Sequence, residues 1–247
     1  MLICTNITKI NHFKLIYSIR YITFASDINT KYNMNMIGVI TGDIIDSTKM
    51  DIESRNNLLI SIEEVTKELK VLSPLKLELF RGDSFQMIVY KPEETLKIAV
   101  LLRAKIKSIT PHEYKKTWDA RLAVGIGEIS YTSDKVIISD GEAFHFSGRE
   151  LDEIGKRRLT IKTKWKDVND ELKVSTAFAD NIITDWTVIQ AQIVYQALLY
   201  KTPQKDIAIK YKKTAQNISK ILGSAKENLI NIYLERYYAL ITNNLTK

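Results

Sequence analysis

The order of the predicted secondary-structure elements between residues 36 and 126 constrains the fold more than any other feature. The spacing of apolar residues predicts strand, helix, strand, strand, helix and strand. Their ranges are 37–44, 53–71, 75–80, 84–90, 92–109 and 119–126. This order is that of the split βαβ, ferredoxin-like arrangement. We therefore expect an α+β fold whose first strand is central and lies beside the second strand of the hairpin.

The pattern changes towards the C-terminus. A further outer strand, a short helix and a last strand are predicted, and no strand pattern follows residue 170. A long helix is expected to run to about Tyr200, and Pro203 then marks the start of an all-helical segment. The predicted divisions are an N-terminal extension (1–35), a sheet domain (36–165), a connecting helix (166–202) and a helical module with a terminal helix (203–247).

Composition excludes several classes of protein. The chain has 247 residues, 45% of them hydrophobic, as in ordinary globular proteins. Its one cysteine, Cys4, excludes a disulfide framework and a cysteine-based zinc site. The apolar runs are shorter than the roughly 20 residues of a membrane span, so we expect a cytoplasmic protein without membrane contact.

Residues 1–35 differ from the rest of the chain. Ile, Asn, Lys, Tyr and Phe supply twenty of these residues, and Gly, Pro, Val and Glu are absent. No small-residue cleavage site follows the weakly apolar run, so the segment does not match a signal peptide. We hypothesise that translation starts at Met36 or Met34 and that the preceding segment adds nothing to the fold.

Two Gly-Asp pairs follow or end predicted strands that should be neighbours. Asp43 lies in the segment 41–48, and Asp83 lies at the tip of the predicted hairpin. If both converge, their carboxylates and the carbonyl of Ile44 form an oxygen-ligand set that suits Mg²⁺, or Mn²⁺, with nucleotide phosphates. The alternative is that both are turn residues, because Gly-Asp favours turns.

A third segment, residues 140–151, is predicted to enter a helix after a strand. His145 and Arg149 are four residues apart and share a helix face. An arginine there could bind a phosphate in a bidentate manner. The alternative is that Arg149 pairs with neighbouring acids and that His145 is structural.

Three common motifs are absent from the sequence. It has no phosphate-binding P-loop and no Gly-x-Ser-x-Gly. Gly125-Ile126-Gly127 lacks the third glycine of a dinucleotide-binding fingerprint and lies in a strand pattern.

Together, the three segments resemble the catalytic domain of class III nucleotide cyclases and related palm-type enzymes. The matching residues are Asp43-Ile44-Ile45-Asp46-Ser47-Thr48, Gly82-Asp83 and Arg149, with His145 at the family's asparagine position. The resemblance implies metal ligands at Asp43, Ile44 and Asp83, and a catalytic arginine at Arg149. It also implies nucleotide contacts at Ser47, Thr48, Arg81, His145 and Arg149, and a homodimer. The family's base-selecting Lys and Asp have no counterpart here.

From Met36 onwards the chain also resembles the SatD-like proteins of bacteria. The similar segments are Val39–Ile44, Phe80–Gln86, Arg121–Gly127 and Ile161–Thr163. The phrase from Arg81 to Gln86 is the most specific of them. This resemblance covers most of residues 36–240. It indicates a related family but does not identify the reaction.

Positive charge is concentrated at the C-terminus. Residues 200–247 hold nine basic and three acidic residues, a net charge of +6. Helices predicted over 204–211 and 215–223 have the spacing of a helix-turn-helix and resemble that of sigma-type bacterial regulators. The residues predicted to contact double-stranded DNA are Lys205, Lys212, Lys213, Thr214, Gln216, Asn217 and Lys220. The alternative is a helical hairpin for packing or dimerization.

Two functions remain open at this point. One is a DNA-binding regulator whose cyclase-like domain binds a nucleotide with Mg²⁺ as a signal. The other is an active nucleotidyl cyclase or nucleotidyltransferase that converts a nucleoside triphosphate with two metal ions. A purely structural adaptor is a third, weaker alternative.

Overall fold

The computed structural model describes residues 35–80, 83–131, 136 and 140–247. Residues 35–244 form one compact unit. The expectations for residues 1–34, including translation start at Met34 or Met36, and the expected role of Arg81 lie outside the described residues. No helix in the described part of the chain is both long and apolar enough to cross a membrane.

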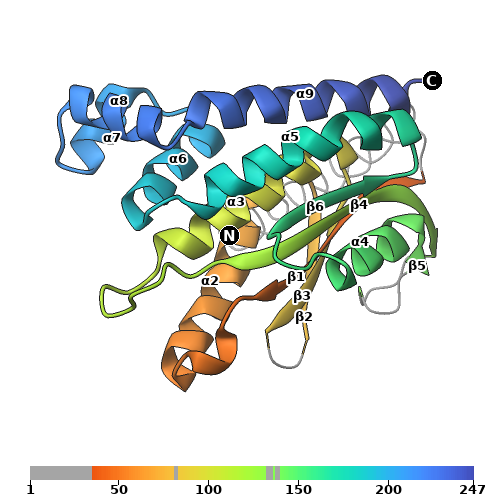
Figure 1. Ribbon diagram of the computed structural model, residues 1–247, viewed down its shortest axis with the longest axis horizontal. Coiled ribbons are helices and arrows are strands. Elements are labelled where there is room, and N and C mark those ends of the chain that lie inside the picture. The colour runs from red at the N-terminus through yellow and green to blue at the C-terminus, as the bar shows by residue number, and fades with distance from the viewer. Residues whose placement is uncertain (1–34, 81–82, 132–135, 137–139) are drawn as a thin grey trace, which may run out of the picture. The chain divides into compact units, whose positions relative to one another are not determined.

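A mixed sheet with β1 at its centre organises the fold (Figure 1). The strand order is β2-β3-β1-β4-β5, and β6 pairs with β4 in parallel while the other pairs are antiparallel. The strands are β1 (Met36–Ile44), β2 (Leu75–Leu79), β3 (Ser84–Val89), β4 (Ala120–Tyr131), β5 (Asp140–Gly141) and β6 (Leu159–Thr163). The fold is thus α+β, with the hairpin strand β3 beside β1.

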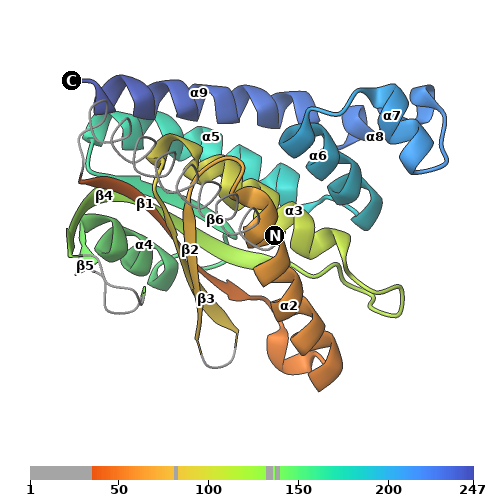
Figure 2. The ribbon, with the colours of Figure 1, turned by 180° about the vertical axis from the view of Figure 1, so that it is seen from behind.

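Helices cover both faces of the sheet (Figures 1 and 2). The helices of the described residues are α2 (Ile52–Leu69), α3 (Thr95–Ser108), α4 (Glu142–Asp152), α5 (Lys166–Thr184), α6 (Val188–Tyr200), α7 (Gln204–Lys210), α8 (Ala215–Ser224) and α9 (Glu227–Leu245), with 3₁₀ turns η1 (Ser47–Lys49) and η2 (Pro92–Glu94). Side chains alternate along β1, so Gly38 faces Thr95 of α3. Val39 packs instead with Ala143 and Phe144 of α4. Helix α4 therefore lies on the opposite face of the sheet from α3.

The strand predicted at 119–126 continues through 128–131, and the whole forms β4. Two other predicted boundaries were wrong. The expected long helix is broken after Thr184, and α6 restarts at Thr187, whose side chain forms a capping box with Gln190. Helix α8 continues past Gly223 to Ser224, and the left-handed turn falls on Lys226 (φ 56°).

The C-terminal helices pack on one another and on the sheet domain. Helices α6, α7 and α8 are in mutual contact. The indole nitrogen of Trp186 donates to the carbonyl of Ala225 at 2.8 Å, and the hydroxyl of Tyr237 donates to the carbonyl of Pro92 at 2.8 Å. These buried hydrogen bonds attach α9 and the end of α8 to elements that precede them. The division at residues 165 and 203 stays a prediction.

Close packing of α4 on β4 leads to a first prediction. A Cβ atom at Gly125 would lie 2.1 Å from the carbonyl oxygen of Ala143 and 2.7 Å from the backbone nitrogen of Ser147. Gly125→Ala should therefore displace α4 and lower the free energy of unfolding by about 1–3 kcal/mol in chemical denaturation. Gly148→Ala is the control, because nothing lies within 4 Å of a Cβ there and alanine favours the helix. Equal stability of both variants would contradict the packing.

Candidate functional site

Asp43 and Arg121 form an ion pair at the end of the sheet where β1 finishes. The two residues lie directly opposite each other on β1 and β4. Nε of Arg121 donates to Oδ1 of Asp43 at 2.9 Å, and Nη2 donates to Oδ2. The hydrogen bonds to Asp43 raise the pKa of Arg121, and the charges of Asp43 and Asp83 add to this effect. Both oxygens of Asp43 are thus engaged by one guanidinium.

Asp83 lies beside this pair. Asp43 is opposite Ser84 in the β1–β3 register, and the backbone nitrogen of Ile44 donates to the carbonyl of Asp83 at 3.1 Å. The Ser47 hydroxyl donates to Oδ2 of Asp83. The structure therefore brings together Asp43, Ile44, Ser47 and Asp83, four of the residues singled out from the sequence.

The turn after β1 links these residues to η1. Asp46 adopts a left-handed conformation (φ 58°) and pairs with Lys49, whose ammonium lies 2.6 Å from Oδ1 of Asp46. Ser47 is buried, whereas Thr48 is exposed. The reversal at Asp46 lets the buried Ser47 hydroxyl reach Asp83 while Thr48 points to solvent.

His145 and Arg149 lie on the exposed face of α4. The helix instead turns Ala143 and Ser147 towards the sheet, and the hydroxyls of Ser147 and Thr41 are 2.8 Å apart. His145 pairs with Asp140, with Nε2 and Oδ1 3.2 Å apart. Within the described ranges, no hydrogen bond or ion pair joins Arg149 to Asp43 or Asp83. Asp43 and Asp83 thus come together at one end of the sheet, whereas His145 and Arg149 lie on the solvent-facing side of α4.

The donor chemistry at Asp43 and Asp83 fits Mg²⁺ held largely by nucleotide phosphates. Across residues 35–80, 83–131 and 140–247, no three His, Cys, Asp or Glu side chains are grouped to hold a metal. Mg²⁺ in nucleotide sites is commonly bound by only one or two carboxylates, with phosphates and water completing its shell. Asp43 and Asp83 satisfy that smaller requirement, provided that Arg121 releases Asp43.

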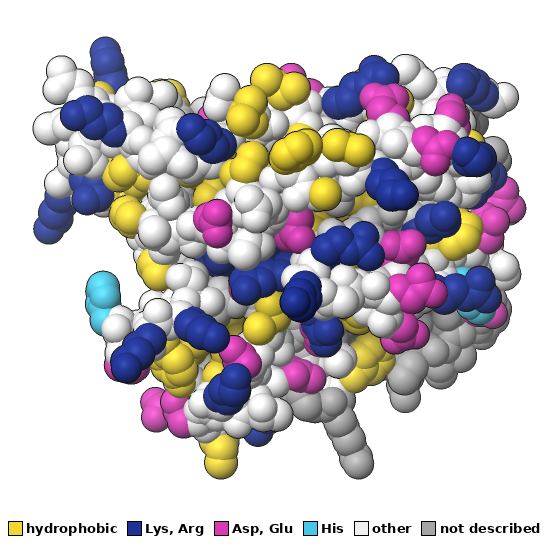
Figure 3. Space-filling model, viewed as in Figure 1, with side chains coloured by type: hydrophobic (Ala, Val, Ile, Leu, Met, Phe, Trp, Pro, Cys, Tyr) yellow, Lys and Arg dark blue, Asp and Glu magenta, His cyan; other side chains and the backbone are white. Residues whose placement is uncertain are grey.

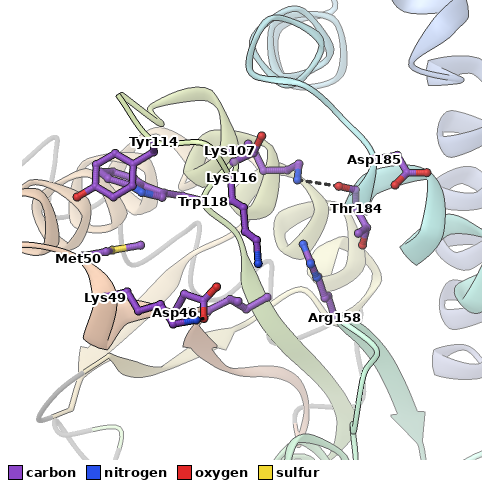
Figure 4. Close-up of a pocket in the computed structure, with 12 residues that line it drawn as sticks. Asp46, Lys49, Met50, Lys107, Tyr114, Lys116, Trp118, Arg158, Thr184 and Asp185 are labelled. Atoms are coloured by element: carbon purple, nitrogen blue, oxygen red, sulfur yellow. Dashed lines mark hydrogen bonds and ion pairs between the residues drawn. The ribbon is translucent and has the colours of Figure 1, made fainter. Parts of the chain in front are cut away.

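A cavity of about 470 Å³ lies at the same end of the sheet (Figure 4). Its lining residues come from the β1–α2 connection, the segments before β4 and β6, and the ends of α3 and α5. They are Ile45, Asp46, Lys49, Met50, Lys107, Tyr114, Lys116, Thr117, Trp118, Arg158, Thr184 and Asp185. No pattern in the sequence indicates this cavity, because its residues lie in separate segments that share no motif.

A buried charge network forms the floor behind the cavity. Arg103 of α3 is fully buried and donates two hydrogen bonds to Asp119, at 2.9 and 2.8 Å, and one to Asp180 of α5, at 2.7 Å. Arg158 also donates to Asp119, at 2.9 Å, and Lys107 lies 3.4 Å from the same carboxylate. Burial lowers the pKa of Lys107, although Asp119 opposes the shift. The network joins α3, α5 and the start of β4.

The residues predicted to bind DNA are all exposed. Lys212 takes a left-handed conformation (φ 51°) in the turn between α7 and α8. The hydroxyl of Thr214 caps α8 by accepting from the nitrogen of Asn217 at 3.1 Å. Ile218 and Leu222 are buried on one face of α8, so Gln216, Asn217 and Lys220 on its other side are in contact with solvent. Lys205 of α7 and the turn residues Lys212 and Lys213 are exposed as well. Figure 3 shows Lys and Arg side chains spread over this end of the molecule.

Comparison with known proteins gives a weak structural similarity. No protein-family model matches the chain, and no curated protein matches it. A bacterial light-regulated adenylyl cyclase is similar in structure, with 12% identity, a TM-score of 0.38 and coverage of 51% of this chain and 75% of that chain. The active GGEEF domain of a diguanylate cyclase from Vibrio cholerae gives 13% identity, a TM-score of 0.36 and coverage of 51% and 83%.

Both matched structures are described as nucleotide cyclases, and each match covers about half of this chain. Neither the SatD-like resemblance nor the helix-turn-helix has a family match behind it. Scores at this level identify neither a substrate nor a reaction, so a function has to be inferred from the geometry of the sites.

Proposed function

We propose that this chain binds a nucleotide with Mg²⁺, or with Mn²⁺ in its place, at the end of β1 and β3. The observation that carries the proposal is the placement of two carboxylates next to η1: Asp43 on β1 lies between Arg121 on β4 and the start of β3, which Asp83 directly precedes. Carboxylate oxygens and a nearby arginine suit a metal–phosphate ligand better than a neutral one.

Arg121 has a defined part in this proposal. Its guanidinium occupies both oxygens of Asp43, so it has to release Asp43 before a metal can bind there. Arg121 is 40% exposed and can turn towards solvent. The released guanidinium then lies beside the site as a bidentate donor to phosphate oxygens. Mg²⁺, when bound, neutralises part of the phosphate charge. Ser47 and Thr48 follow Asp43 by four and five residues and are proposed to contact the same phosphates.

A catalytic function is the alternative at this site. A nucleotidyl cyclase would use Asp43 and Asp83 with Arg149 as the residue that stabilises phosphate charge. Arg149 lies on the exposed face of α4, opposite the face that meets the sheet. This position favours nucleotide binding over catalysis within one chain. In a homodimer, Arg149 of the second copy would complete the catalytic site.

Calorimetric titration with ATP, GTP, CTP and UTP, in Mg²⁺ and again in EDTA, tests the proposed binding. We expect at least one of these nucleotides to bind in Mg²⁺ and to lose its affinity in EDTA. Mass analysis of the same mixtures after incubation with Mg²⁺ or Mn²⁺ distinguishes the two alternatives. Unchanged nucleotide indicates binding alone, and a cyclic or linked product indicates an enzyme. Equal affinity in Mg²⁺ and EDTA would contradict the metal's role.

A second proposal concerns double-stranded DNA. The face of α8 opposite Ile218 is polar and exposed, and it presents Gln216, Asn217 and Lys220 together. Gln and Asn can pair with adenine edges in the major groove, whereas lysines contact phosphates or guanine. We therefore propose that α8 binds DNA and that the nucleotide at the sheet acts as its signal.

The DNA proposal makes a prediction about two variants. Gln216→Ala should weaken binding to a preferred DNA site by about 1–3 kcal/mol and leave binding to random DNA unchanged, because it removes a base contact. Lys213→Ala should weaken binding to the preferred site and to random DNA equally, because it removes a phosphate contact. It should also reduce the slope of log binding constant against log salt concentration by about one unit. Fluorescence anisotropy against genomic fragments at several salt concentrations measures both. Binding that is absent or independent of salt would leave α7 and α8 as a packing hairpin.

A further inference from the structure

The cavity between η1, the segment 114–118 and the ends of α3 and α5 has the features of a second ligand site. We propose that it binds a nucleoside phosphate, separately from the Asp43–Asp83 site. Its volume of about 470 Å³ is in the range of small-molecule pockets, which run from about 300 to 1,000 Å³. The charges, the unpaired donors and the aromatic wall of the cavity together specify this class of ligand.

Basic side chains dominate the charged lining. Lys49, Lys107, Lys116 and Arg158 line the cavity, against the acidic Asp46 and Asp185. Figure 4 shows Lys116 and Arg158 directed towards the same space beside Asp46. The charges of both lower the pKa of Asp46, after the larger effect of its hydrogen bond with Lys49. Several cations converging from different segments match the several oxygens of a phosphate group.

Some of these cations already have partners. Asp119 accepts from Arg158 and lies near Lys107, and Asp46 pairs with Lys49. Lys107 also donates to the carbonyl of Thr184 at 3.0 Å. These contacts fix the side chains in position rather than neutralise the cavity, because a guanidinium or ammonium can donate to more than one acceptor.

Two donors at the cavity have no partner among the residues that the structure describes. Lys116 makes no ion pair or hydrogen bond there. Nε1 of Trp118 is buried, with the residue only 6% exposed, and finds no acceptor. Leaving a buried donor unsatisfied costs about 1–3 kcal/mol, so most such groups in native proteins have a partner. This nitrogen has almost no exposed surface in the structure, so a ligand oxygen in the cavity would bind it once the Trp118 ring turns towards the cavity.

An aromatic and apolar wall completes the cavity. Tyr114 and Trp118 pack edge to face with their ring centroids 5.1 Å apart, and Met50 lies in the same lining. Apolar walls with a few placed donors are typical of sites for ring-bearing ligands. A nucleoside phosphate has both a ring that can pack on the aromatic wall and an anionic group that can bind the basic side chains.

The cavity and the Asp43–Asp83 site lie on opposite faces of the sheet. Asp43 is on the α4 face of β1, whereas the cavity is lined by Lys107 of α3 and Thr184 of α5 on the other face. The connection after β1 separates them: Ile45 and Asp46 line the cavity, and Ser47 binds Asp83. A ligand in the cavity would therefore contact the segment that positions Ser47.

Calorimetric titration of the full chain with AMP, GMP, adenosine and inorganic phosphate in EDTA tests the proposal. EDTA removes any metal-dependent binding at Asp43 and Asp83, and the Asp83→Asn variant repeats the test with that site disabled. We expect AMP or GMP to bind in both proteins and to bind at least about tenfold more tightly than adenosine, which lacks the phosphate.

Two variants and a matched control locate the binding. Lys116→Gln should weaken AMP or GMP about tenfold, because it removes a charged donor, and Trp118→Phe should weaken it about fivefold while keeping an aromatic ring. Lys115→Gln, an exposed neighbour that does not line the cavity, should leave the affinity unchanged. Lys116 is itself exposed, so its variant is expected to fold even if Trp118→Phe does not.

The outcomes separate this proposal from the proposed function. Loss of AMP and GMP binding on Asp83→Asn would place these ligands at the metal site and overturn the second site. Absence of binding in wild-type protein, or equal affinities of Lys116→Gln and Lys115→Gln, would overturn it as well. Binding in EDTA that Lys116→Gln weakens supports it whatever the metal-dependent titrations show.

Discussion

Asp119→Asn is expected to lower the free energy of unfolding by about 3–5 kcal/mol, the cost of breaking a buried ion pair from one side. The Asp119 side chain is 1% exposed and accepts hydrogen bonds from Arg103 and Arg158. Asparagine keeps the shape and can still accept from the nitrogen of Ala120, which lies 2.9 Å from Oδ1. It removes the charge, however, and leaves the fully buried Arg103 with Asp180 as its anionic partner.

Urea denaturation measures this effect, with Asp152→Asn as the control because Asp152 is exposed at the end of α4. The control should change the free energy of unfolding by less than about 0.5 kcal/mol. A loss below about 1 kcal/mol for Asp119→Asn would show that the network contributes little to stability.

The same carboxylate should make stability depend on pH. Burial alone would raise the pKa of Asp119, but the charge and hydrogen bonds of Arg103, with those of Lys107 and Arg158, outweigh burial and lower it to about 2 from 3.8. The folded state therefore binds this proton more weakly than the unfolded state does. The resulting stability, about 2 kcal/mol, is present above pH 4 and is lost as the pH falls towards 2. Asp119→Asn should lack this part of the acid dependence.

The second large effect concerns nucleotide binding. Asp43→Asn and Asp83→Asn should each weaken Mg²⁺-dependent nucleotide binding by at least about 100-fold, because even residues that only support metal ligands cost 10–100-fold when changed. Asp43 is partly exposed at 19%, and asparagine can still accept from Arg121, so we expect the fold to persist. Calorimetry in Mg²⁺ measures the affinity, and circular dichroism checks the fold.

Asp167→Asn, an exposed change in the first turn of α5, is the matched control for the loss of one negative charge. Its nucleotide affinity should equal that of the wild type. Affinities that are unchanged in both Asp43→Asn and Asp83→Asn would exclude these carboxylates as metal ligands.

Much of the sheet could be predicted from the sequence because its signals are local. Apolar alternation marks β2, and the branched residues of the first strand mark a buried β1. The helix break at residues 185–187 was not predicted, because the apolar pattern continues through both helices. The sequence signal for the break is the capping box of Thr187 and Gln190. The end of α8 was misplaced because glycine favours, but does not require, a helix end.

The candidate site was predictable only in part, for a related reason. Asp43 and Asp83 carry a local signal, the Gly-Asp pair, and topology then places both strands side by side. Arg121 has no such signal, since its role comes from standing opposite Asp43 across the β1–β4 register. Trp118 and Lys116 depend on how α3, α5 and η1 enclose a cavity, which no spacing in the sequence encodes.

Anomalous scattering from Mn²⁺ in crystals grown with a nucleoside triphosphate is the most direct test of the central claim. We expect an anomalous peak between the carboxylates of Asp43 and Asp83, with Arg121 turned from Asp43 to the phosphates. A bound nucleotide with the Asp43–Arg121 ion pair intact and no anomalous peak at these carboxylates would contradict the claim.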